Sequence, residues 1–95
     1  MKMVGRDEAE LIGLQAVAWL AANDELLPVF LGATGASAED FRNNLSDPGF
    51  QGGVLDFLLM DDAWVRGFCD ETGLPYDLPF QARQHLPGGG EVHWT

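Results

Sequence analysis

The pattern F-x-x-x-T-G occurs twice in this chain, at residues 30–35 and 68–73. A glycine directly after a helix often takes the left-handed conformation that only glycine adopts at low cost. The residue after that glycine then packs back on the last helical turn, where the phenylalanine of each motif lies. We therefore interpret Gly35 and Gly73 as helix stops. Each predicts a helix on its N-terminal side.

The first copy lies in the run FLGATGAS, residues 30–37, which also looks like a glycine loop for phosphate. A P-loop requires the pattern G-x-x-x-x-G-K-[ST] after a strand. This run has neither the lysine nor a preceding strand pattern. These glycines therefore indicate the end of a helix rather than a phosphate-binding site.

The two motifs belong to a longer self-similarity at an offset of 38 positions, the distance from Gly35 to Gly73. At this offset Leu20 aligns with Leu58, and Phe30 aligns with Phe68. Apolar and polar positions agree along the segment between these pairs. We interpret this as an internal repeat of one three-helix unit.

Hydrophobic spacing and capping residues predict an all-α fold of five to six short helices. The expected segments are 7–22, a helix from a cap at Asn23 or Asp24 to about 34, and helices capped by Ser37, Asp47, Asp61 and Asp77, the last ended by Pro87. No stretch alternates long enough to predict a strand. The 7–22 helix is apolar nearly all round, so we expect it to be buried. Residues 1–87 form one helical domain, followed by a glycine-rich tail at 88–95.

The charge balance limits the partners of this chain. Fifteen acidic against five basic residues give a formal net charge of −10. Such a chain repels nucleic-acid phosphates and anionic lipids, so we expect neither nucleic-acid nor membrane binding. A surface that mimics nucleic acid remains an alternative, although the acids are scattered along the chain. The apolar stretch 11–22 is shorter than the ~20 residues of a membrane span.

The single cysteine, Cys69, excludes an internal disulfide and fits a cytoplasmic location. Three acids, Asp7, Glu8 and Glu10, directly precede the first apolar stretch, which is wrong for a signal peptide, because its apolar run follows a basic start. No histidine lies near Cys69 in sequence, and Asp70 and Glu71 are expected to raise its pKa. We predict a small buried hydrophobe rather than a nucleophile.

No residue pattern predicts a catalytic, cofactor or metal site. His85 and His93 are separated by a proline and glycines, without the further ligands that zinc requires. Asp61 and Asp62 fit helix capping better than a hard cation, because the EF-hand spacing is absent. Asp56 and Asp61 lie too far apart along a helix to form a carboxylate pair. We therefore favour a non-catalytic role without a cofactor, and an enzyme with a pocket between the helical repeats remains an alternative.

For four other side chains, the sequence allows a contact either within the chain or with a partner. Arg42, Arg66 and Arg83 either pair with acids on their own or a neighbouring helix, or anchor a partner. Trp94 on the glycine-rich tail docks either on its own domain or on a second copy of the chain.

A combination of short segments resembles a known family. The segments are Trp19-Leu20-Ala21, Phe30-Leu31 with Thr34-Gly35, Asp40-Phe41-Arg42, Asp47-Pro48, residues 54–58 and Gly73-Leu74-Pro75. They resemble the bacterial domain-of-unknown-function family numbered 3572, typical of alphaproteobacteria. The resemblance covers roughly residues 9–86 and implies a compact helical cytoplasmic protein. It implies no catalytic or binding residues, because the motifs are helix caps and core positions.

Three functions follow as hypotheses, and none identifies a partner or substrate. The first is a non-catalytic module that binds another protein or itself, which the surplus of large apolar side chains favours. The second is a small-ligand binder or enzyme with a pocket between the helical repeats. The third is the acidic nucleic-acid mimic.

Overall fold

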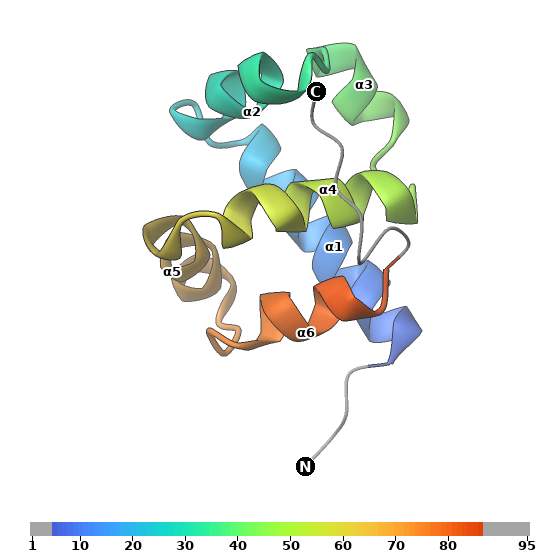
Figure 1. Cartoon of the computed structure of the whole chain (residues 1–95), viewed down its shortest axis with the longest axis vertical. Coiled ribbons are helices and arrows are strands. Elements are labelled where there is room, and N and C mark those ends of the chain that lie inside the picture. The colour runs from blue at the N-terminus through green and yellow to red at the C-terminus, as the bar shows by residue number, and fades with distance from the viewer. Residues whose placement is uncertain (1–4, 87–95) are drawn as a thin grey trace.

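The computed structural model describes residues 5–86, which form helices and connecting loops without a strand (Figure 1). The helices are α1 (Arg6–Ala21), α2 (Leu26–Thr34), α3 (Ala38–Asn43), α4 (Pro48–Leu59), α5 (Asp62–Thr72) and α6 (Leu78–Gln84). The predicted all-α fold is confirmed. The predicted tail at 88–95, with His93 and Trp94, lies outside the described residues.

Helix α1 lies at the centre of the packing. It runs behind α4 and α6 in Figure 1, and it also contacts α2 and α5. One face of α1 is buried against these helices and consists of Ala9, Ile12, Gly13, Ala16, Val17 and Leu20. The central position agrees with the prediction. The expectation of burial all round is wrong, because the opposite face of α1 is exposed.

Both F-x-x-x-T-G motifs end a helix in the same way. Gly35 after α2 and Gly73 after α5 are left-handed, each with φ of 77°. In both motifs the threonine hydroxyl donates to the phenylalanine carbonyl, at 2.8 Å. The copies differ one residue later. Leu74 N–H donates to the Cys69 carbonyl, as in a Schellman motif, whereas Ala36 N–H donates to the Thr34 hydroxyl. The helix-stop interpretation is confirmed.

We expect Gly35→Ala and Gly73→Ala each to lower the free energy of unfolding by more than about 1 kcal/mol. No atom crowds a Cβ at either position, so the cost comes from the left-handed backbone alone. Urea unfolding of the two variants measures it. Unchanged stability in both would contradict the assignment of these glycines as helix stops.

At most helix starts, the residue that caps the helix is one that the sequence predicted. The Ser37 hydroxyl accepts from Asp40 N–H and the Asp40 carboxylate accepts from Ser37 N–H, which is a reciprocal capping box. Asp47 and Asp61 cap α4 and α5. Of the two candidates before α2, Asn23 accepts backbone bonds there.

Asp77 lies at the N-cap position of α6, as predicted, but it does not act as a side-chain cap. Its side chain accepts no backbone bond from α6 and instead accepts from Gln81 Nε2 at 2.8 Å. The second residue of α6 is Pro79, which has no N–H to donate to a cap.

A tight contact joins α1 to α4 at Gly13. A Cβ on Gly13 would lie 2.7 Å from Gln51 Cβ and 2.8 Å from Gln51 Oε1. Gln51 is 2% exposed, and its Nε2 donates to the Leu45 carbonyl at 2.9 Å. Within residues 5–86 its Oε1 accepts no hydrogen bond. The missing side chain of Gly13 therefore permits the close approach of the two helices.

We expect Gly13→Ala to destabilise the protein by about 1–2 kcal/mol, because overpacking outweighs the better helix propensity of alanine. Gly32→Ala on α2 is the matched control, since nothing lies within 4 Å of a Cβ there. It should be neutral or slightly stabilising. Thermal unfolding of both variants tests the difference, and a stabilised Gly13→Ala would refute the proposed crowding.

Candidate functional site

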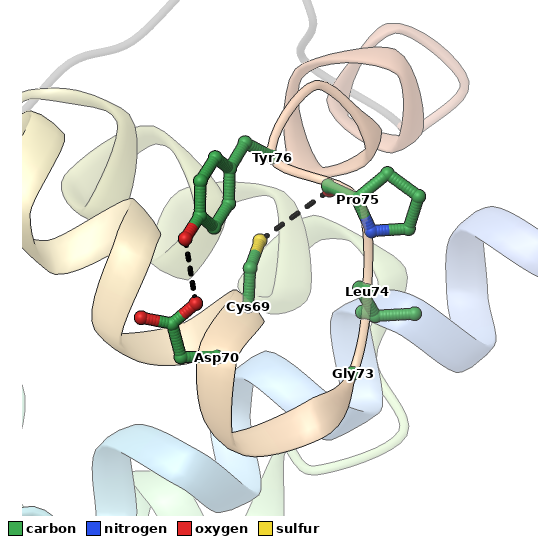
Figure 2. Close-up of a pocket in the computed structure, with 6 residues that line it drawn as sticks. All are labelled: Cys69, Asp70, Gly73, Leu74, Pro75 and Tyr76. Atoms are coloured by element: carbon green, nitrogen blue, oxygen red, sulfur yellow. Dashed lines mark hydrogen bonds between the residues drawn. The ribbon is translucent and has the colours of Figure 1, made fainter.

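A shallow hollow of about 360 Å³ lies where α5 stops and the chain turns toward α6 (Figure 2). It is lined by Cys69, Asp70 and residues 73–76. Figure 2 shows the Tyr76 hydroxyl donating to Asp70 Oδ1 at 2.7 Å. The Cys69 thiol donates to the Pro75 carbonyl at 3.5 Å. The hollow thus brings a thiol, a phenol and a carboxylate together.

Neither the thiol nor the phenol of this hollow is activated. Burial raises the pKa of the Cys69 thiol, and the charges of Asp70 and Asp77 raise it further. The hydrogen bond to Asp70 raises the pKa of Tyr76. Both groups are therefore protonated at neutral pH. Cys69 is 1% exposed, which confirms the prediction that it is a small buried hydrophobic residue. The two acids whose charges raise its pKa are Asp70, as expected, and Asp77 in place of Glu71.

The raised pKa of Cys69 predicts a stability loss at alkaline pH. The unfolded thiol ionises near its ordinary value of 9.0, whereas the folded thiol resists ionisation. The stabilisation is therefore complete below pH 9 and disappears as the pH rises through the higher folded pKa. We expect urea midpoints to fall more steeply above pH 9 in the wild type than in Cys69→Ala. Parallel profiles would contradict this linkage.

A second hollow, of about 220 Å³, is apolar. It is lined by Phe30, Thr34, Ala36, Gly49, Phe50 and Gly53. None of these side chains is ionisable, and the Thr34 hydroxyl already donates to the Phe30 carbonyl and accepts from the Ala36 N–H. This hollow offers apolar contact without acid–base chemistry.

A third hollow, of about 270 Å³, combines an aromatic ring with carboxylates. We call it the acidic hollow; it is lined by Trp19, Ala22, Asn23, Asp24, Glu25 and Glu71. The Asn23 side chain shapes its rim, because Oδ1 accepts from the N–H groups of Glu25 and Leu26 at 3.0 Å each. Asp24, Glu25 and Glu71 are exposed. Among residues 5–86, none of these three carboxylates forms an ion pair.

The exposed side of α1 leads into the acidic hollow. This α1 outer face consists of Leu11, Leu14, Ala18, Ala21 and Ala22, all exposed. Leu11 is 58% exposed and Leu14 is 37% exposed. No charged residue occurs between Leu11 and Ala22, and Ala22 itself lines the hollow. The molecule therefore presents a continuous apolar helix face that ends at three carboxylates.

Of the three arginines singled out in the sequence, two form ion pairs within the fold. Arg83 of α6 donates to both oxygens of Asp56 on α4, at 2.7 and 2.8 Å, and Arg66 pairs with Asp62 within α5 at 2.6 Å. The predicted local pairing is confirmed for these two. Arg42 forms no ion pair with another described residue.

The other sequence candidates do not come together. His85 lies exposed at the end of α6, Asp61 caps α5, and Asp56 pairs with Arg83. No group of three metal-ligating side chains is found in the part of the chain that the structure describes. Sequence reasoning missed the Tyr76–Asp70 bond and the acidic hollow, since both depend on how the loops fold back.

Comparison with known proteins identifies a matching family. A family model described as "Protein of unknown function (DUF3572)" matches residues 6–89. No curated protein and no solved structure matches the chain. Within residues 5–86 no single helix is long and apolar enough to cross a membrane; α1 and α2 reach that length and composition together but are bent by 107°.

Proposed function

The chain belongs to the DUF3572 family, whose description names no activity, and we propose that it is a non-catalytic module that binds another protein through the α1 outer face. The proposal rests on one observation, namely that α1 is apolar on two opposite faces. Its inner face fills the core, while Leu11 and Leu14 on the outer face meet water. A helix that is apolar on both faces is typical of one that is covered on both sides.

Charge favours a different protein over a second copy as the partner. Acids lie at both ends of the α1 outer face, with Asp7 and Glu8 at its start and Asp24 and Glu25 after its end. The base at the start of α1, Arg6, already pairs with Glu10 of the same helix. Two copies paired through this face bring acids against acids, in either parallel or antiparallel orientation. Like charges placed together oppose such an interface. Self-association through this face is therefore the weaker form of the proposal.

A small-ligand binder is the second candidate, and the acidic hollow supports it. The hollow lies between residues 19–25 of the first half and Glu71 of the second half, and it holds three titratable side chains. An enzyme has less support, because Cys69 and Tyr76 stay protonated and Asp70 is already bonded. The nucleic-acid mimic requires the acids to gather on one face at phosphate-like spacing, and no observation favours it over the other two.

We propose further that the two halves, α1–α3 and α4–α6, are an internal repeat. The matching φ angles of Gly35 and Gly73 and the matching threonine bonds support this. A cytoplasmic location and a bacterial, alphaproteobacterial origin remain proposals as well. The single cysteine supports the first, and the residues shared with the family suggest the second.

The test is affinity capture from source-organism lysate with matched surface variants. Leu11→Gln/Leu14→Gln disrupts the α1 outer face, and Val29→Gln/Phe80→Gln changes two exposed apolar residues elsewhere. We expect one salt-tolerant partner that the wild type and the control retain and the α1 variant loses. Equal capture by all three proteins would refute the proposal. Circular dichroism must show equal helicity, and light scattering reports self-association.

A further inference from the structure

We infer that the partner presents an amphipathic helix whose apolar stripe covers the α1 outer face and whose arginine or lysine enters the acidic hollow. This inference rests on the proposed function and specifies the chemistry of the partner. It combines two features of the surface that meet at Ala22.

The geometry sets the length of the partner helix. Leu11 and Ala22 are eleven residues apart in a continuous helical stretch, and at 1.5 Å per residue the α1 outer face extends over about 16 Å. About three turns of a second helix cover this length. An apolar stripe at i, i+3 or i+4, and i+7 on that helix then ends above the acidic hollow.

Electrostatics decide the charge of the residue at that end. The carboxylates of Asp24, Glu25 and Glu71 surround the hollow, and among the described residues none has a cationic partner. The C-terminal end of α1, whose last turn contains no basic residue, adds the negative end of a helix dipole, and the positive end of α2 at Leu26 offsets part of it. A basic side chain of the partner supplies the missing positive charge. An acidic one meets repulsion from the whole chain, whose net charge is −10.

The lining of the hollow favours arginine over lysine. Trp19 is half-buried, forms a T-shaped aromatic pair with Phe68, and lines the hollow together with Ala22. A guanidinium stacks on an indole and also bonds carboxylates in a fork geometry, whereas an ammonium is a compact point charge. The alkyl stem of the arginine contacts Ala22 on its way into the hollow.

The experiment is a selection from a phage-displayed library of randomised helical peptides against the folded protein. We expect wild-type protein to enrich peptides with an apolar stripe and a basic residue, mainly arginine, at one end. Neutralising the hollow with Asp24→Asn/Glu25→Gln/Glu71→Gln should weaken an enriched peptide roughly tenfold. Glu71→Gln alone should weaken it more than Glu39→Gln, an exposed acid on α3 that serves as the matched control.

The outcomes separate the two proposals. Peptides that need Leu11 and Leu14 but show no basic preference, and bind the neutralised hollow equally well, overturn this inference and leave the proposed function standing. Peptides that are enriched equally on wild type and Leu11→Gln/Leu14→Gln overturn both. Loss of binding in both variants, with arginine enriched, supports both.

Discussion

Asp56→Asn is expected to lower the free energy of unfolding by about 3–5 kcal/mol, the usual cost of breaking a buried ion pair from one side. The Arg83 side chain is 7% exposed and that of Asp56 is 17% exposed. Two parallel hydrogen bonds join them, and a third runs from Arg83 Nη1 to the Leu86 carbonyl at 3.3 Å. In the variant, the arginine charge stays in the interior without the carboxylate. Urea unfolding monitored by circular dichroism measures the loss.

The double variant Asp56→Leu/Arg83→Met is the control for this prediction. It removes both charges and replaces them with apolar groups, so it should retain much more stability than Asp56→Asn. A loss below about 1 kcal/mol in Asp56→Asn would show that the pair does not hold α6 to α4.

Phe30→Ala is expected to cost about 3–5 kcal/mol, the range for removing a buried aromatic ring. Phe30 of α2 is 1% exposed and, among residues 5–86, makes edge-to-face contacts with the rings of Phe41, Phe50 and Phe57. The ring centroids lie 5.2 Å from Phe41 of α3, and 6.1 and 5.2 Å from Phe50 and Phe57 of α4. Its removal therefore weakens the attachment of α2 and α3 to α4 at once.

Phe80→Ala on α6 is the matched substitution, because Phe80 is 57% exposed. We expect it to change stability by less than about 1 kcal/mol. Equal losses in the two variants would contradict the central role of the Phe30 cluster in the core.

The features that sequence reasoning predicted are those with local causes. The stops at Gly35 and Gly73, the capping box at Ser37 and the caps at Asp47 and Asp61 each depend on neighbours within a few residues. Such interactions are encoded by spacing alone. The helix starts and stops could therefore be located before the structure was known.

The features that sequence reasoning missed or left open depend mostly on how the helices and loops pack. The sequence predicted that Arg83 pairs with an acid, but it did not identify Asp56, which lies 27 positions away. It also did not indicate the contact between Gly13 and Gln51 across two helices. The outer face of α1 was predicted to be buried, because an apolar sequence does not show which of its faces the remaining helices cover. That error identifies the candidate interface, since the uncovered side contains Leu11 and Leu14.

The central claim, that another protein covers the α1 outer face, is tested most directly by photo-crosslinking in cells of the source organism. Benzoylphenylalanine replaces Ala18 on this face in one variant and Glu39 on α3 in the other, both exposed positions. The account predicts a discrete adduct with a different protein from position 18, absent from position 39, and lost when Leu11 and Leu14 become glutamine. Equal adduct patterns at both positions, or no adduct at position 18, would contradict it.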